Sequence, residues 1–337
     1  MLSILAPVSG VLPLLKLVLV SVLFALLTAT SLSAAHAAPV AQSEACNPAR
    51  PAEAGKIETT LQSGGLDRYF EMYLPTSYDG VTPLPIVMGI HGLTSNPSQQ
   101  RQFSRWDELG EREGFISVYP AGTGTPRRWN AGGTFENSAA REINARIYGE
   151  PADDVTFFRD LLDHLEATYC IDPTRVYATG LSNGGGMSNR LACEMADRIT
   201  AIGTVAGAYT ELEDGCNPSR PVPVIAFHGG EDPIVAYQGE QFSETVTLPF
   251  IEDWAAEWAE RNGCGTPLVV ETAAPDVIIV REWLDCDADA LVTLYTLPDG
   301  GHTWPGGLVL PEFLVGITRV DIDASAIMWE FFQDYSL

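Results

Sequence analysis

Residues 177–187 read YATGLSNGGGM, and this stretch decides how the rest of the chain is interpreted. The residues before it predict a β-strand over 175–179, and those after it predict a helix over 183–195. Between them, the spacing Gly180-x-Ser182-x-Gly184 keeps side-chain bulk away from a serine where backbone segments crowd together. The stretch therefore predicts a tight strand-to-helix turn that exposes the hydroxyl of Ser182.

The same glycines would also suit a phosphate-binding loop or a merely flexible connection. A phosphate cradle requires Gly-Lys-Ser/Thr, or a Gly-x-Gly-x-x-Gly opening followed by a ribose-binding acid, and this stretch has neither. A strand before the serine and a helix after it are the setting that a nucleophile elbow requires. We therefore interpret Ser182 as a catalytic nucleophile.

A serine nucleophile in such a turn is followed along the chain by a carboxylate and then by a histidine base. The histidines after Ser182 are His228 and His302. His302 comes just after the last predicted strand, and Asp232 lies on the loop after an earlier strand, so we predict His302 as the base and Asp232 as the carboxylate that orients it. His228 is interpreted as a structural residue at a strand end. Three further carboxylates fit less well: Asp253, Asp285 and Asp299.

The oxyanion of such a reaction needs two backbone N–H donors. We expect one from Asn183, directly after the nucleophile, and the other from Leu93, in the loop after His91-Gly92. His91 itself is expected to brace that loop. This chemistry needs no metal and no cofactor, and none of the six cysteines forms a Cys-x-x-Cys pair.

Predicted strands alternate with predicted helices, which favours an α/β fold with a mostly parallel central sheet covered by helices on both faces. Strands are expected at 57–62, 68–74, 85–90, 115–119, 175–179, 201–205, 222–227, 269–271, 277–282 and 291–296. Helices are expected at 106–112, after a cap at Asp153 or Asp154, at 183–195, around Trp254 and Trp258, and at 325–335. No repeat or clean linker is visible, so we predict one catalytic domain over 55–337.

The N-terminal residues predict export. Lys16 precedes an apolar run that ends in a small-x-small site before Ala38, so residues 1–37 are interpreted as a signal peptide and residues 38–54 as a leader. A retained membrane anchor is the alternative, although the run is shorter than the ~20 residues that a spanning helix needs. We expect a secreted protein, extracellular or periplasmic, without a membrane partner after cleavage. The formal charge of −25 also disfavours nucleic acid as a partner, because it repels polyanions.

Four segments considered together are distinctive: IHG at 90–92, CIDPTRVYATGLSNGGGMSNRLAC at 170–193, FHGGEDPIVAYQG at 227–239 and GGHTWPG at 300–306. Their joint pattern resembles the secreted polyhydroxybutyrate depolymerase-like esterase family, which is similar to feruloyl and acetylxylan esterases. The resemblance implies an α/β-hydrolase fold and a Ser-Asp-His triad on Ser182, Asp232 and His302. In one departure, Gly186 stands where the family usually has methionine, and we expect this to loosen the packing behind the turn.

Six cysteines in an exported chain favour disulfides over metal, and the sequence alone allows fifteen pairings of six cysteines. Their positions resemble those in the feruloyl esterase branch of the family. This resemblance implies the pairs Cys264–Cys286, Cys193–Cys216 and Cys46–Cys170.

The expected substrate is a carboxylic ester, polymeric or oligomeric. The loop at 122–149, with Trp129, and Trp304 beside the predicted base would suit an aromatic or sugar-bearing acyl group, unless both tryptophans simply pack the rim. Feruloyl or acetyl esters of plant polysaccharide are the first expectation, and polyhydroxybutyrate or short hydroxyalkanoate esters the second. A serine peptidase of the same fold and a non-catalytic carbohydrate-binding relative remain as alternatives.

Overall fold

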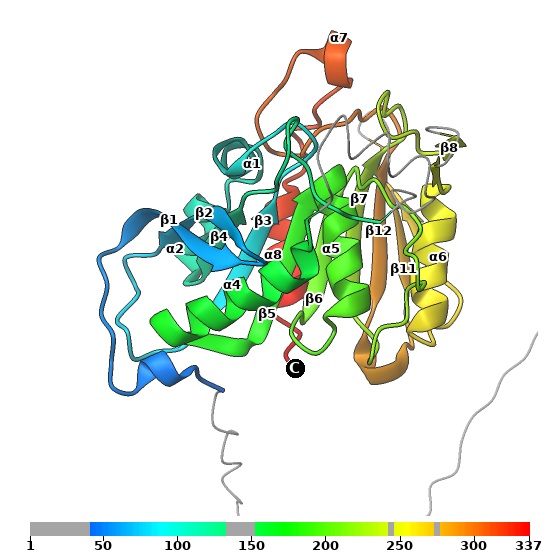
Figure 1. The fold of residues 1–337 in the computed structure, drawn as a ribbon. Coiled ribbons are helices and arrows are strands. Elements are labelled where there is room, and N and C mark those ends of the chain that lie inside the picture. The colour runs from blue at the N-terminus through cyan, green and yellow to red at the C-terminus, as the bar shows by residue number, and fades with distance from the viewer. Residues whose placement is uncertain (1–40, 133–151, 242–245, 273–276) are drawn as a thin grey trace, which may run out of the picture. The chain divides into compact units, whose positions relative to one another are not determined.

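The computed structural model describes residues 41–132, 152–241, 246–272 and 277–337. A ten-stranded sheet runs through this part of the chain in the spatial order β1-β2-β4-β3-β5-β6-β7-β12-β11-β10, and β8 pairs with β9 separately (Figure 1). The strands are β1 (Gly55–Ser63), β2 (Leu66–Leu74), β3 (Leu84–Ile90), β4 (Ile116–Pro120), β5 (Ile171–Leu181), β6 (Ala201–Val205), β7 (Val224–Gly229), β8 (Glu240–Gln241), β9 (Thr247–Leu248), β10 (Leu268–Glu271), β11 (Ile279–Trp283) and β12 (Val292–Leu297). The helices are η1 (Glu44–Cys46), α1 (Pro97–Ser104), α2 (Trp106–Glu113), α4 (Asp154–Thr168), α5 (Asn183–Glu194), α6 (Ile251–Arg261), η2 (Asp287–Asp289), α7 (Glu312–Val315) and α8 (Ala324–Phe332).

The central strands of the large sheet are parallel. Neighbours pair in parallel from β4 through β3, β5, β6 and β7 to β12, whereas β1–β2, β2–β4, β12–β11 and β11–β10 pair antiparallel. In a parallel sheet all carboxyl ends lie at one edge, where the loops after β3, β5, β7 and β12 come together. The prediction of a mostly parallel sheet is confirmed, and this edge carries the candidate site.

The hairpin of β1 and β2 shows how local sequence sets the register. Ser63 pairs with Leu66, and the two residues between them, Gly64 and Gly65, have φ angles of 57° and 78°. Positive φ at both turn positions matches the right-handed twist of the strands, and glycine adopts it without steric penalty. The strands predicted at 57–62 and 68–74 are therefore confirmed, and they form a hairpin.

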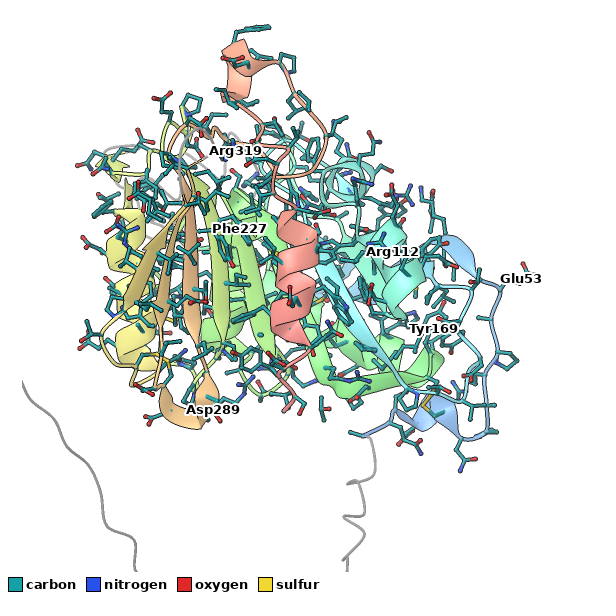
Figure 2. All side chains as sticks on the ribbon, turned by 180° about the vertical axis from the view of Figure 1, so that it is seen from behind. Glu53, Arg112, Tyr169, Phe227, Asp289 and Arg319 are labelled. Atoms are coloured by element: carbon teal, nitrogen blue, oxygen red, sulfur yellow. A yellow bond between two sulfur atoms is a disulfide. The ribbon has the colours of Figure 1, made fainter. Side chains whose placement is uncertain are left out.

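Helices cover both faces of the sheet, as predicted, and each face has its own apolar cluster. On β3, Ile86, Met88 and Ile90 point into one cluster and Val87 into the other, as the period of two in a strand requires. The first cluster includes the apolar sides of α4, α5 and α6, and the second those of α2 and α8 (Figure 1). Figure 2 shows α8 on the second face, beside the strand that carries Phe227.

Four short helices and strands were not predicted, namely α1, β8, β9 and α7, and neither were the single-turn helices η1 and η2. Helix α1 begins at Pro97 after Asn96, whose side chain accepts a hydrogen bond from the N–H of Gln99. The strands β8 and β9 have two residues each, and α7 has four. Elements of two to four residues are too short to show a hydrophobic period, so the sequence does not indicate them.

The three disulfides implied by the family resemblance are confirmed: Cys46–Cys170, Cys193–Cys216 and Cys264–Cys286. The first ties residues 41–54 to the start of β5. Beside it, the N–H of Ser43 donates to the carbonyl of Ile171, and the Ser43 hydroxyl accepts from the N–H of Ile171. The predicted signal peptide lies outside the described residues. No helix within the described residues is long and apolar enough to cross a membrane.

Candidate active site

Ser182 lies in the turn between β5 and α5 with φ 58° and ψ −120°. For a residue with a Cβ atom this is a strained conformation, of the kind that persists when the surroundings hold it in place. Its N–H donates to the carbonyl of Val205 on β6 at 3.0 Å. Its carbonyl accepts from the N–H groups of Gly186 and Ala208, each at 3.0 Å. Ser182 thus presents its side chain at the carboxyl edge of the sheet, where the sequence predicts it.

The glycines around Ser182 have no room for side chains. A Cβ atom on Gly180 would lie 2.3 Å from the backbone of Gly184, and one on Gly184 would lie 2.0 Å from the carbonyl oxygen of Ile90. At Gly186 the same atom would lie 2.2 Å from the carbonyl oxygen of Ala208. The expectation that Gly186 loosens the packing is therefore wrong, because the backbone after β6 fills the space that a side chain would need.

Asp232 and His302 come from the loops after β7 and β12 and form a buried pair. Nδ1 of His302 donates to Oδ2 of Asp232 at 2.8 Å, since a carboxylate oxygen accepts and the ring nitrogen must then carry the proton. Oδ1 of Asp232 accepts from the N–H groups of Ile234 and Val235, both at 2.8 Å. The side chain of Asp232 is fully buried and that of His302 is 9% exposed. This arrangement fixes the ring and leaves its Nε2 available as a base.

Ser182 and His302 line the same cavity, which has a volume of about 600 Å³. Leu93 and Asn183 line it as well, and neither of their backbone N–H groups has a hydrogen-bond acceptor among the described residues. The next N–H along the first loop, that of Thr94, donates to the carbonyl of Arg127 at 2.8 Å and is therefore engaged. The geometry leaves these two N–H groups free beside the serine.

The side chain of Asn183 has a role that the sequence did not indicate. Its Oδ1 accepts from the N–H of Trp129 at 2.8 Å, and its Nδ2 donates to the carbonyl of Trp129 at 3.2 Å. One residue further, the N–H of Asn130 donates to Asp154, whose other carboxylate oxygen pairs with Arg68 at 2.7 Å. Arg68 and Asp154 are both almost fully buried. This network fastens the loop of Trp129 to the turn that carries Ser182.

Trp129 and Trp304 are buried core residues and do not form exposed walls of the cavity. Trp129 is 1% exposed, and its Nε1 donates to the carbonyl of His91. It reaches the lining of the cavity, so a small part of its surface faces that space. Trp304 is 3% exposed, donates from Nε1 to the Ser325 hydroxyl and lines no part of that cavity. Burial thus favours the packing alternative for Trp304 over contact with a substrate.

His91 braces the loop after β3. The ring is fully buried, its Nδ1 donates to the carbonyl of Gly92 at 2.8 Å, and its Nε2 accepts from the N–H of Gly122 at 3.0 Å. Burial lowers the pKa of His91 to about 4. A neutral ring with one donor and one acceptor satisfies both contacts, so His91 connects two loops at the cavity and has no free nitrogen for a reaction.

Several cavity residues could not be found from the sequence. Ile234 and Val235 follow Asp232, and Leu248, Leu310 and Val315 come from segments without a motif. They share only apolar character, which is common throughout a folded chain, so the sequence does not single them out as cavity residues. Among the described residues, no group of three or more His, Cys, Asp or Glu side chains could hold a metal ion.

The strand order, the strained serine turn after β5 and the loops after β7 and β12 define a fold of the α/β-hydrolase class. A solved structure, an acetyl xylan esterase from Aspergillus awamori, has the same fold. It matches with a TM-score of 0.55 and 17% sequence identity, over 74% of this chain and 94% of that one. The predicted fold class is therefore confirmed.

Sequence comparison places the chain beside esterases. Residues 68–215 match the family model described as Esterase PHB depolymerase. Feruloyl esterase B of Piromyces equi is 29% identical over 249 residues, which cover 71% of this chain and 43% of that protein. A probable feruloyl esterase C of Aspergillus terreus is 26% identical over 290 residues, which cover 84% of this chain and 91% of that protein.

The chain thus spans less than half of the length of the Piromyces relative, and 31% of a bifunctional acetylxylan esterase/xylanase of Neocallimastix patriciarum that it also matches. All three relatives are named esterases. The resemblance to the polyhydroxybutyrate depolymerase-like esterase family is confirmed.

Proposed function

We propose that the protein is a serine esterase, in which Ser182 is the nucleophile, His302 the base and Asp232 the carboxylate that orients the base. The observation that carries this proposal is the 2.8 Å contact of His302 Nδ1 with Asp232 Oδ2, in a cavity that His302 shares with Ser182. The strained turn at Ser182 supports it further, because it presents the hydroxyl at the cavity.

In the first half of the proposed reaction, Oγ of Ser182 attacks the ester carbonyl while Nε2 of His302 takes the hydroxyl proton. The negative charge that develops on the carbonyl oxygen is stabilised by the N–H groups of Leu93 and Asn183. The bond to the alcohol breaks as His302 returns the proton to the leaving oxygen. Water then attacks the acyl-serine by the same route, and the acid and free Ser182 are released.

For the substrate, we propose a feruloyl or acetyl ester of plant polysaccharide. The names of the relatives support this class, and a cavity of about 600 Å³ has room for an aromatic acyl group. Its walls are largely apolar, with Leu93, Leu248 and Val315 among them, which suits an aryl or small acyl chain.

A hydroxyalkanoate ester is the second candidate, and a specific surface feature favours it. Beside the cavity residues Leu310 and Val315, the side chains of Leu308, Phe313 and Leu314 are exposed by 46%, 87% and 58%. Exposed apolar groups next to a catalytic cavity suit an apolar, water-insoluble polyester better than a hydrated glycan.

The test is turnover of a panel of substrates: p-nitrophenyl acetate, methyl ferulate, acetylated xylan, hydroxybutyrate oligomers and a peptide amide. We expect Ser182→Ala to lower kcat on the esters by roughly 10⁴-fold or more, because the nucleophile is lost. Ser77→Ala, at an exposed serine, is the control and should keep wild-type rates. Preferential cleavage of the amide would point to a peptidase. A wild-type protein that hydrolyses no ester and does not react with a serine-directed phosphonate would refute the proposal.

We also propose that the protein is exported and processed before Ala38. The apolar N-terminal run and the three disulfides support this, since disulfides persist in oxidising compartments. N-terminal sequencing of protein recovered from culture medium or periplasm should begin at Ala38, and a chain that retains Lys16 would contradict it.

A further inference from the structure

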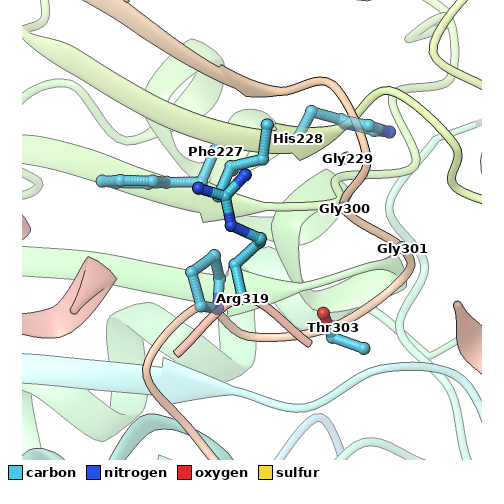
Figure 3. A pocket seen from close by; sticks show the side chains of 9 residues that line it. Phe227, His228, Gly229, Gly300, Gly301, Thr303 and Arg319 are labelled. Carbon is cyan, nitrogen blue, oxygen red and sulfur yellow. The ribbon is translucent and has the colours of Figure 1, made fainter. Parts of the chain in front are cut away.

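His228 is a buried histidine next to the proposed triad that the mechanism above does not use. It lies in β7, its side chain is 1% exposed, and the chain runs from it directly into the turn that carries Asp232. Figure 3 shows His228 at a small cavity, with Arg319 and Gly300 also in its walls. His228 does not line the larger cavity of Ser182. It is therefore close to the triad without access to a substrate.

The contacts of the ring define its protonation. Nε2 of His228 lies 2.9 Å from the carbonyl oxygen of Val235 and 3.5 Å from Oδ2 of Asp232. Both oxygens are acceptors, so Nε2 carries the proton and is shared between them. The other nitrogen, Nδ1, has no hydrogen-bond partner in the described part of the chain. A cationic ring would bury a second donor without an acceptor, and burial accordingly lowers the pKa of His228.

These contacts hold the Asp232 turn from both sides. The N–H of Val235 donates to Oδ1 of Asp232, while the carbonyl of Val235 accepts from His228. Oδ2 of Asp232 faces Nδ1 of His302 at 2.8 Å and Nε2 of His228 at 3.5 Å. The turn is therefore fastened to β7 through one imidazole and to the loop after β12 through another. Without His228, nothing else among the described side chains would link Val235 back to β7 by a hydrogen bond.

We propose that His228 is a positioning residue: its Nε2–H holds the 232–235 turn so that Oδ2 of Asp232 faces Nδ1 of His302. This inference rests on the proposed function, because it assigns His228 to the support of a triad. His228 touches no reacting atom. Its effect passes through Asp232 to the orientation of the His302 ring, and it should therefore appear in kcat and not in substrate binding.

Two amide variants test this role. In His228→Gln, the side-chain Nε2 stands as many bonds from Cβ as the imidazole Nε2 does, so it can still donate to Val235. In His228→Asn, the amide nitrogen reaches only to the position of Nδ1 and leaves Val235 without its donor. We expect His228→Asn to lower kcat for p-nitrophenyl acetate roughly 10- to 100-fold with KM unchanged, and His228→Gln to stay within about fivefold of wild type.

A second measurement does not depend on turnover. The proton between His302 Nδ1 and Asp232 should give a downfield signal in the proton NMR spectrum of ¹⁵N-histidine-labelled protein. We expect the signal in wild type and His228→Gln, and its loss in His228→Asn, while the remaining spectrum shows that each variant is folded.

Equal kcat values for the two amide variants would overturn the positioning role. So would a fall in kcat/KM that comes from an increase in KM and not from a decrease in kcat. If His228→Asn fails to fold, a folded His228→Gln variant that has lost kcat and the downfield signal would overturn it equally. If wild type hydrolyses no ester, the proposed function fails, and the NMR signal alone decides whether His228 holds Asp232 against His302.

Discussion

At the scale of single residues, the candidate site depends on backbone contacts that fix each functional side chain. Ser182 is held by Val205, Gly186 and Ala208, and Asp232 by the N–H groups that follow it. Each member of the proposed triad comes from a different loop, so its geometry is a property of the sheet edge where those loops meet.

Asp232→Asn tests the carboxylate. Nδ1–H of His302 would then face an amide, which favours the wrong tautomer or orientation of the ring, and we expect kcat on p-nitrophenyl acetate to fall by about 10³- to 10⁴-fold. KM should change little, because Asp232 lies outside the cavity lining. Asp285→Asn is the matched control, since Asp285 is exposed and beside a disulfide. A larger loss in the control than in Asp232→Asn would contradict the assignment.

Chain order, together with the place of each residue just after a predicted strand, was enough to predict that Asp232 and His302 meet, because the serine turn restricts where its partners can follow. Their supports could not be predicted. Asn183 binds the backbone of Trp129 across 54 residues, and Arg68 pairs with Asp154 across 86. Such contacts leave no local pattern, since the same residue types at the surface would be unremarkable. The hydrogen bond from His228 to Val235 is missed for the same reason.

At the scale of elements, the long strands and helices could be predicted from the period of their apolar residues, and the turns between them from the positions of glycine. The helix start at Asp153 and the hairpin at Gly64-Gly65 each have a chemical cause that acts within a few residues. Helix α5 is different. Its first turn is rich in glycine, which opposes helix formation, and the cause lies outside the helix in the backbone that it packs against.

Gly186→Ala separates helix propensity from packing. Alanine favours a helix over glycine by about 1 kcal/mol, so propensity alone predicts a gain in stability. The new Cβ would lie 2.2 Å from the carbonyl oxygen of Ala208, and overpacking of this kind costs about 1–3 kcal/mol. We expect a net loss of up to about 2 kcal/mol in the free energy of unfolding, measured by urea denaturation.

The control for this change is Gly265→Ala, at an exposed glycine whose added Cβ would lie 3.4 Å or more from its neighbours. It should stay within about 0.5 kcal/mol of wild type. A gain in stability for Gly186→Ala would show that the backbone after β6 moves aside to admit a Cβ atom.

At the scale of the whole molecule, two apolar clusters and three disulfides hold a strongly acidic chain together. The Cys46–Cys170 bridge closes the longest interval, 124 residues, and fastens residues 41–54 to the central strand β5. Cross-links over long intervals restrict the unfolded chain most. At the carboxyl edge of the sheet, by contrast, buried polar side chains connect the loops, as His91 does between Gly92 and Gly122.

His91 provides the clearest pH dependence of stability. Burial holds its pKa at about 4 in the folded protein, below the ordinary value of 6.5 that it regains on unfolding. Between these values the unfolded chain binds more protons, so the free energy of unfolding falls as the pH falls from about 6.5 to about 4. The contribution of His91 should be about 2 kcal/mol smaller at pH 5 than at pH 7. His91→Gln keeps a donor and an acceptor but cannot titrate. Between pH 7 and pH 5, the free energy of unfolding of this variant, measured with urea, should therefore fall by about 2 kcal/mol less than that of wild type. Equal losses in both proteins would mean that His91 does not remain neutral in the fold, and that its Nε2 does not accept the N–H of Gly122.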